Sequence, residues 1–409
     1  MTMEYQHGRA YQHMEKGLHL ERQGLLDEAM LEFKHAIEAD PSMPMAHHAL
    51  GQHYQRKGLL TKAADEFHTA SLLSDDFDCY FSLGRALTDL DRFPEACEAF
   101  EACLRLDAED PSARYELAYV QYAAGEIDRA LAGFRSLLDV YPDDWELKLA
   151  IANCHISRKE FPEARDTLLQ GLSNAPAGAD TTSMRDALVL VERHLEFGEE
   201  PQSGVKGQLY GDFGVVCLGS GQDDGMDIPV YADHAFSLPD IARTLARFHA
   251  LIREFDWRFT AVVSSDPGGL PLALALAEMV NAPLIEPDQA QPDDLVLLVS
   301  SQLVQPELYD VILEHLPAHV LSFALTAPWQ EDKTPAPDIL GVPCQGSCGL
   351  QEQDYQQRSP RSMAELLLRT QRSLPPEENI QQQMAYYVQH HTRLRFLEAT
   401  SEPVREQPE

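Results

Sequence analysis

Basic residues are scarce in this sequence of 409 residues, which has 32 Lys and Arg against 66 Asp and Glu. The formal net charge is −34 at pH 7. A protein that binds a polyphosphate needs clustered Lys and Arg side chains, because these displace the counterions of the phosphates. We therefore expect neither nucleic acid nor an anionic membrane surface as a partner, whereas a basic protein partner fits the charge.

Long hydrophobic runs are also missing. The longest, Leu270 to Leu276 and Leu295 to Val299, are far shorter than the ~20 residues that a bilayer requires. The first residues have no basic run followed by an apolar one, so no secretory signal is predicted. Seven cysteines, an odd number, are scattered along the chain. This usage favours reduced thiols in a cytoplasm over a disulfide framework.

A repeated pattern occupies the first half of the chain. Alanine recurs at a spacing of 33 or 34 residues, a small residue stands twelve places before each alanine, and a large apolar residue stands four places after it. Such a period indicates stacked supersecondary units in which small residues allow two antiparallel helices to cross closely. The alanines are Ala29, Ala63, Ala96, Ala130 and Ala164; the small residues are Gly17, Gly51, Gly84, Ala118 and Ala152; the large residues are Phe33, Phe67, Phe100, Phe134 and Leu168.

This pattern resembles the tetratricopeptide repeat over residues 10–178, about two fifths of the chain. The departures are modest: Lys159 replaces the turn glycine of the last unit, and Asp75 and Ala108 stand where proline is usual. Residues 180–197 have the apolar spacing of one more helix, which would cap the stack. We therefore predict an α-helical solenoid of five repeats plus a capping helix over residues 10–198.

The resemblance implies that certain first-helix positions of each repeat line a concave groove. Several of these positions carry aromatic or amide side chains, which suit an extended or helical peptide. The paired lysines and asparagines with which some repeat proteins hold a carboxylate are absent. The alternative for Phe81, Tyr115 and Tyr119 is that they fill the core. The predicted groove residues are His48, Gln52, Phe81, Arg85, Tyr115, Tyr119 and Tyr122.

The repeat pattern ends before a segment rich in Gly, Pro and charge, residues 199–210, which we interpret as a linker. Apolar strands then alternate with helices over residues 211–345, which predicts a parallel sheet covered on both faces. The expected strands are 214–218, 227–231, 259–265, 295–300 and 320–326, and the expected helices are one capped by Ser237 and Asp240, 270–280 and 306–316.

Part of this domain, Val262 to Ala277 and Leu295 to Val299, resembles the core of a type I phosphoribosyltransferase. In that family a glycine turn after the first core strand cradles pyrophosphate, and the residues that match this turn are Asp266, Pro267, Gly268 and Gly269. The second signature of the family is absent. Where it has an acidic pair and a Thr-Gly loop, this sequence has Ser300, Ser301, Gln305 and Pro306.

No Lys or Arg occurs between Phe259 and Asp332, so a substrate with several phosphates would meet acids without cations. The resemblance therefore implies a retained fold and a lost transferase activity, that is, no enzyme. Two interpretations of the turn stay open: a tight connection alone, or a small-anion site at the following helix N-terminus.

Other candidates for chemistry are weak. Cys344 and Cys348 have a spacing that could serve a metal, but no second ligand pair follows, so free thiols are expected. His13, His47 and His48 are interpreted as polar helix surface. We predict no metal site, no cofactor and no catalytic residue. Residues 346–400 form a helical C-terminal extension, with a capping box at Ser362, and residues 401–409 are expected to be disordered.

These observations favour a cytoplasmic, bacterial, non-catalytic adaptor or scaffold that binds a protein or peptide in the concave groove. Two alternatives remain. One is an enzyme or small-ligand sensor for an anion or nucleotide that uses Asp266 to Gly269. The other is an assembly or maturation chaperone that uses the same groove. The sequence leaves the partner, the oligomeric state and the role of the C-terminal helix open.

Overall fold

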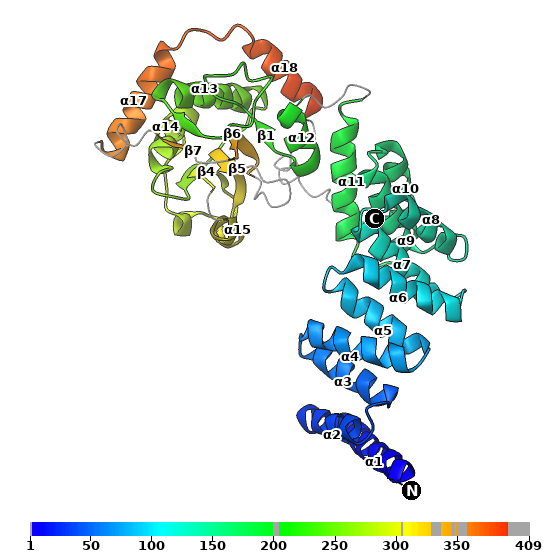
Figure 1. Cartoon of the computed structure of the whole chain (residues 1–409). Coiled ribbons are helices and arrows are strands. Elements are labelled where there is room, and N and C mark those ends of the chain that lie inside the picture. Colours follow the sequence, from blue (N-terminus) through cyan, green and yellow to red (C-terminus); the bar gives the residue numbers. More distant parts are fainter. Residues whose placement is uncertain are drawn as a thin grey trace, which may run out of the picture. The chain divides into compact units, whose positions relative to one another are not determined.

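The computed structural model describes residues 2–198, 204–303, 306–328, 337–345, 348–350 and 358–391. The chain divides into two compact units, Met1–Arg185 and Asp186–Glu409. The first is entirely helical and the second contains a sheet (Figure 1). None of the helices in the described residues combines the length and the apolar character that a membrane crossing demands.

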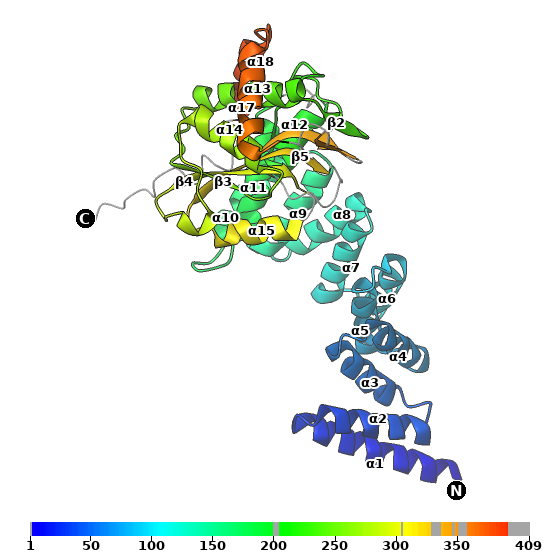
Figure 2. The same cartoon turned by 90° about the vertical axis from the view of Figure 1, so that its left-hand side faces the viewer.

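The first unit consists of antiparallel helix pairs that follow one another along the chain, as the repeat pattern predicts. Figure 2 shows α1 and α2 lying side by side, and each later pair does the same. The division between the units falls within the last helix, α11. The helices are α1 (Thr2–Arg22), α2 (Leu26–Ala39), α3 (Pro44–Arg56), α4 (Leu60–Leu73), α5 (Phe77–Thr88), α6 (Phe93–Leu106), α7 (Pro111–Ala123), α8 (Ile127–Leu138), α9 (Trp145–Ser157), α10 (Phe161–Asn174) and α11 (Thr182–Leu195).

In the first three pairs the crossing of the two helices depends on a glycine that faces an aromatic ring. A Cβ atom added to Gly51 would lie 2.7 Å from the ring of Phe67, and one added to Gly17 would lie 2.5 Å from Phe33. Both rings are fully buried. In the fourth pair Ala118 replaces the glycine. There the facing helix α8 carries Gly133, whose added Cβ would lie 2.9 Å from the Ala118 Cβ.

The connection inside each pair contains a residue with a positive φ. This residue is a glycine in three pairs, for example Gly58 with φ 71°. Lys159, which replaces the glycine in the fifth pair, keeps the left-handed conformation with φ 59°. The substitution therefore preserves the turn, although a side chain costs ~1 kcal/mol in this conformation.

The second unit contains a parallel sheet of strand order β1-β6-β5-β4-β3. Leu284 forms a parallel bridge with Val262 on the free side of β3. A separate pair consists of β2 and β7, also parallel. The strands are β1 (Val216–Cys217), β2 (His234–Phe236), β3 (Ala261–Ser264), β4 (Leu295–Gln302), β5 (His319–Pro328), β6 (Ile339–Cys344) and β7 (Cys348–Leu350).

Helices cover both faces of this sheet, as predicted. Alternate strand residues face opposite cores: Leu297 packs in the cluster of α13, α14, α17 and α18, and Leu298 packs in the cluster of α15. Figure 1 shows α13, α14 and α17 on one side of the sheet and α15 on the other. The helices are α12 (Gly204–Phe213), α13 (Leu238–Glu254), α14 (Leu270–Val280), the short η1 (Pro287–Gln289), α15 (Pro306–His315), α17 (Pro360–Ser373) and α18 (Ile380–His390).

Several boundaries differ from those expected. Residues 204–210, assigned to a linker, form most of α12, because Leu209 and Tyr210 are buried in the core and fix this segment. Residues 199–203 lie outside the described residues. The second strand is β2 instead of 227–231, and neither β6 nor β7 was predicted.

The C-terminal extension and its cysteines also depart from expectation. The cap of α17 is Ser359, whose Oγ accepts a hydrogen bond from the Ser362 amide at 3.3 Å. Cys344, expected as a free thiol, is disulfide-bonded. The helices α17 and α18 pack on α13 of the sheet domain. The tail predicted to be disordered, residues 401–409, lies outside the described residues.

The helix crossings give a matched stability test. Gly51→Leu should lower the free energy of unfolding by about 1 to 3 kcal/mol or more, because the side chain overlaps the buried Phe67 ring. Gly8→Leu is the control, since nothing lies within 4 Å of its added Cβ in helix α1. It should leave stability unchanged or slightly raised through helix propensity. Urea unfolding followed by far-ultraviolet circular dichroism measures both, and equal midpoints would contradict the role of the crossing.

Candidate functional site

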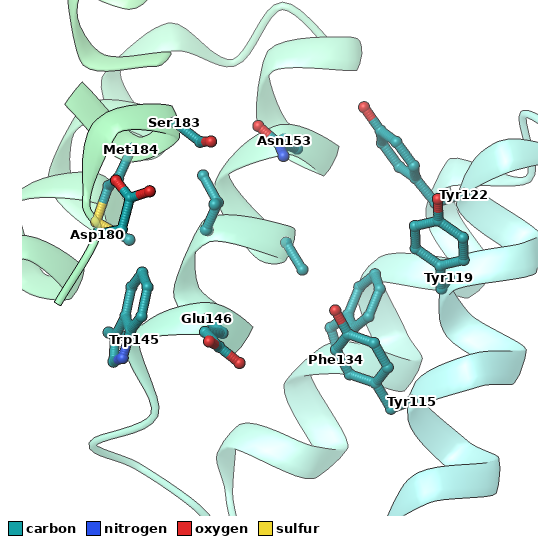
Figure 3. A pocket seen from close by; sticks show the side chains of 12 residues that line it. Tyr115, Tyr119, Tyr122, Phe134, Trp145, Glu146, Asn153, Asp180, Ser183 and Met184 are labelled. Atoms are coloured by element: carbon teal, nitrogen blue, oxygen red, sulfur yellow. The ribbon is translucent and has the colours of Figure 1, made fainter. Parts of the chain in front are cut away.

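Two adjoining pockets lie on the helical unit, and Tyr115 and Glu146 line both. The first, of about 310 Å³, is shown in Figure 3. The second has a volume of about 370 Å³. The first is lined by Tyr115, Tyr119, Tyr122, Phe134, Trp145, Glu146, Leu149, Ala150, Asn153, Asp180, Ser183 and Met184, and the second by Phe81, Pro111, Ser112, Tyr115, Glu116, Leu137, Tyr141, Asp144, Glu146 and Leu147. We call the two pockets together the tyrosine groove.

Three tyrosines of α7 form one wall of the tyrosine groove. Their spacing of four and three residues places them on one stripe of the helix. Figure 3 shows Tyr115, Tyr119 and Tyr122 facing the side chains of α9 and of the start of α11 across the pocket. Tyr115 and Tyr119 remain 36% and 46% exposed, so they are surface residues of the groove and do not fill the core.

Contacts with neighbouring side chains support Tyr115 and Tyr122. The Tyr115 ring meets the buried Phe134 edge to face, with ring centroids 5.6 Å apart. The Tyr122 hydroxyl accepts a hydrogen bond from Ser157 Oγ at 3.4 Å. Partial burial raises the pKa of Tyr115, so its phenol stays neutral. The wall therefore presents apolar ring faces with polar hydroxyl tips, which suits contacts to both apolar and polar groups.

The charges at the tyrosine groove are all negative among the residues that line it. Glu146 borders both pockets, Asp180 the first, and Glu116 and Asp144 the second. The Asp144 carboxylate caps α9 by accepting the amides of Glu146 and Leu147 at 2.9 and 3.0 Å. Burial raises the pKa of Glu116. A cationic group beside an apolar one is the ligand chemistry that this groove fits.

The structure brings Phe81, Tyr115, Tyr119 and Tyr122 together at the tyrosine groove. Phe81 stacks on Phe77 and lies edge to face against Phe100, and it is only partly exposed. The other three predicted groove residues do not line it.

His48 lies within the stack, where its Nε2 is 3.0 Å from Ser82 Oγ and its ring is 5.4 Å from that of Phe67. Burial lowers its pKa. Gln52 and Arg85 are exposed, and the Arg85 Nε lies 3.9 Å from Glu116 Oε1. An Arg85 side chain this close to Glu116 adds one cation at the edge of the second pocket.

Sequence reasoning missed the wall opposite the tyrosines, which includes Trp145, Asp180, Ser183 and Met184. Trp145 is the first residue of α9, directly after its Asp144 cap. A Cβ on Gly171 would lie 2.6 Å from the Met184 Cε, so this glycine of α10 admits the start of α11. The available signal was a small residue, Gly171, followed by a further helical segment, but this pair of features does not belong to the regular repeat.

The glycine turn of the sheet domain lies between the carboxyl ends of the adjacent strands β3 and β4. The Asp266 carboxylate folds back over this turn. It accepts the amides of Gly269 and Ser301, each at 2.8 Å, and the Ser301 hydroxyl at 2.6 Å. The Gly269 and Ser301 amides, which an anion at this turn could use, are therefore already bonded to a carboxylate of the chain.

Close contacts around the turn also explain why residues 268 and 269 are glycines, since a Cβ atom has no room at either position. An added Cβ on Gly268 would lie 2.7 Å from Ser301 Oγ, and one on Gly269 would lie 3.0 Å from Asp266 Oδ2 and from the Val299 carbonyl oxygen. Ser300 Oγ pairs with Ser265 Oγ at 2.6 Å. Pro267 is exposed, Pro306 is the first residue of α15, and Gln305 lies outside the described residues.

A buried polar group in the sheet domain was not predicted at all. Lys206 of α12 is only 1% exposed. Its Nζ donates to the Gly225 carbonyl oxygen at 2.5 Å and to the Tyr387 hydroxyl at 2.8 Å, and it lies 4.1 Å from the Tyr387 ring centroid. Burial lowers the pKa of Lys206 to about 7. The contact joins α12 to the C-terminal helix α18.

Arg247 of α13 forms a second buried group beside it. The guanidinium donates to Asp223 Oδ1 at 2.8 Å, to Glu377 Oε1 at 2.6 Å and to the Leu218 carbonyl oxygen at 2.9 Å. These bonds tie the loop after β1 and the segment before α18 to one helix. Because all three guanidinium nitrogens donate hydrogen bonds within the domain, we assign Arg247 a structural role.

Comparison with known proteins identifies the helical unit. Residues 81–137 and 115–179 match the family model of the tetratricopeptide repeat. The tetratricopeptide repeats predicted from the sequence are thereby confirmed in this part of the chain. No match was found among curated proteins.

Solved structures with similar folds include a MamA protein, with 22% identity, 41% of this chain and 91% of the other covered, and a TM-score of 0.39. Another is YrrB, described as a tetratricopeptide repeat protein with an unusual peptide-binding site, with 20% identity, coverages of 43% and 89%, and a TM-score of 0.40. MamA from Desulfovibrio magneticus RS-1 has 15% identity, coverages of 41% and 94%, and a TM-score of 0.38.

The buried Lys206 predicts a dependence of stability on pH. Its folded-state pKa, about 7, lies below the ordinary value of 10.5. Below pH 7 both states hold the proton and the folded state bears the full cost of the buried charge. As the pH rises above 7 the folded state loses this proton first, so stability increases by up to about 1.4 kcal/mol per pH unit.

Lys206→Met should remove this increase between about pH 7 and about pH 9. Trp257 is buried in the core of the sheet domain, and a background of Trp145→Phe and Trp329→Phe leaves it as the only tryptophan fluorophore. Urea unfolding followed by Trp257 fluorescence at both pH values gives the change in the free energy of unfolding between them. The lost hydrogen bonds of Lys206 cost stability equally at both pH values, so only the change in slope is diagnostic. Equal slopes would contradict the assignment.

Proposed function

We propose that this chain is a non-catalytic adaptor whose repeats hold a segment of a partner protein in the tyrosine groove. The observation that carries the proposal is the exposed wall of Tyr115 and Tyr119 beside two adjoining pockets. Tyrosines held rigidly by packing provide large contact area at little cost in side-chain entropy, and such residues commonly dominate binding energy.

The partner segment carries Lys or Arg next to an apolar residue. Glu146 stands between the two pockets with Asp180 and Glu116 on either side, and no Lys or Arg is among the residues that line them. The whole chain is strongly acidic, so long-range attraction also favours a basic segment. An apolar side chain of the segment occupies a pocket while its cation meets Glu146.

The proposal assigns no transferase activity to the sheet domain. A relation to the phosphoribosyltransferases is supported by the edge position of Leu284 beside β3 and by the glycine turn between β3 and β4. Against phosphate binding, the Asp266 carboxylate already accepts the Gly269 and Ser301 amides. A phosphate would have to displace a carboxylate from these donors and would then meet its charge.

The groove is tested with peptides selected from a random peptide display library on the immobilised full chain. The selected peptides should share a Lys or Arg beside an apolar residue. Tyr115→Ala/Tyr119→Ala should weaken their binding at least about tenfold, because truncating two aromatic contacts at the centre of an interface removes ~2 kcal/mol or more. Fluorescence anisotropy of a labelled peptide measures the affinity.

Matched variants separate the groove from general surface effects. Leu72→Ala/Leu169→Ala removes two exposed apolar side chains from second helices, 74% and 48% exposed, and should leave affinity unchanged. Glu146→Lys should weaken binding more at low than at high salt, whereas Glu98→Lys on α6 should not. Circular dichroism checks that each variant stays folded. Equal binding by the wild type and the tyrosine double variant would refute the groove.

The absence of transferase chemistry is tested by calorimetry with phosphoribosyl pyrophosphate and Mg²⁺. The wild-type chain should show no saturable binding at ligand concentrations up to about 1 mM, because the turn offers satisfied donors and no cation. Saturable binding in the micromolar range would overturn this part of the proposal and leave the groove untouched.

A further inference from the structure

Three metal-binding side chains meet across the first helix pair. His13 projects from α1, and Glu32 and His35 stand three residues apart on α2, which places them on one face of that helix. One ligand atom from each lies within 4.8 Å of the other two. Within the described residues this is the group of His, Cys, Asp and Glu side chains that could hold a metal ion.

Glu32 is the fixed member of this group. It is 8% exposed, and its Oε2 lies 2.7 Å from His13 Nδ1 while its Oε1 accepts from Lys16 Nζ at 2.6 Å. The two imidazole rings lie with centroids 5.3 Å apart. His35 is exposed. A buried carboxylate thus lies close to two imidazoles, one partly buried and one exposed.

We propose that His13, Glu32 and His35 form a Zn²⁺ site that joins α1 to α2. Two imidazoles and one carboxylate are a ligand set that Zn²⁺ accepts with a fourth position left for water. Ligand bonds of ~2.0 to 2.2 Å place the ligand atoms ~3.3 Å apart around the ion. The ligand atoms now lie up to 4.8 Å apart, so the largest distance between two of them has to shorten by ~1.5 Å. The exposed His35 covers this distance by changing its rotamer. His13 binds through the nitrogen that faces Glu32 and carries its hydrogen on the other.

The second helix pair provides an internal comparison. One repeat later, His47 and Glu66 hold the same positions, and His47 Nδ1 lies 2.7 Å from Glu66 Oε2. Thr69 stands where the first pair has His35, and its hydroxyl donates to the Asp65 carbonyl oxygen at 2.9 Å. The His and Glu contact is therefore a feature that both pairs share, and His35 is the residue that completes a ligand set in the first.

A bound ion would stabilise this pair in particular. The pair packs on the next one through α2 and α3. An ion that binds the folded pair and not the unfolded chain adds stability that grows with its concentration. The site is independent of the tyrosine groove, so each can fail without the other.

Calorimetric titration of the chelator-treated full chain with ZnCl₂ tests the site. The wild type should bind one equivalent of Zn²⁺. His35→Thr, which gives the first pair the residue of the second, should lower the affinity for Zn²⁺ at least about tenfold, as expected for loss of a ligand. His19→Ala is the control, because this exposed histidine of α1 contacts Gln23 and lies outside the group. It should bind like the wild type.

Two further measurements keep the result interpretable. Circular dichroism without zinc should show His35→Thr as helical as the wild type, and zinc should raise the unfolding temperature of the wild type but not of this variant. Lys16→Met should bind Zn²⁺ at least as tightly as the wild type, because a cation beside Glu32 is removed. No one-equivalent binding, equal affinity of His35→Thr and wild type, or equal weakening by His19→Ala would overturn the site.

Discussion

The close approach of a glycine to a phenylalanine ring at the first three helix crossings is the constraint on which this part of the helical unit depends. With Gly51 against Phe67 and Gly84 against Phe100, no side chain larger than hydrogen fits at the first helix without a shift. The crossing fixes how each first helix is rotated about its axis. In the fourth pair Gly133 of α8 and Ala118 of α7 make the close contact instead, and Tyr115 and Tyr119 of α7 are exposed together.

The same constraint explains how much of the fold could be predicted from the sequence. Small and large apolar residues recur at a constant spacing in all five units, so the helix pairs could be predicted from the sequence. The groove was predicted less well, because exposure at a first-helix position depends on the next repeat. His48 meets Ser82, which lies in the following pair, and the pattern within one repeat contains nothing of that contact.

The sheet domain shows where such prediction ends. Apolar strands and the capped helix α13 were found because their signals are local. Residues 204–210 were assigned to a linker because the segment that contains them is rich in Gly, Pro and charge. Lys206 is nevertheless buried against Tyr387, which lies 181 residues further along the chain. The group around Arg247 likewise joins three segments distant in the chain. Burial of a charge by distant partners leaves no periodic trace in a sequence.

Two kinds of carboxylate distinguish the two units. Asp266 accepts two amides and a hydroxyl of its own domain, so its charge is satisfied internally and repels any further anion. Glu146 lies between two open pockets, with its backbone amide bonded to Asp144 and its carboxylate facing the groove. A carboxylate with internal donors stabilises a turn, whereas one at an open aromatic wall selects cations. Under the proposed function the acidic residues thus act in two ways: Asp266 opposes phosphate at the glycine turn, and Glu146 favours a basic segment at the tyrosine groove.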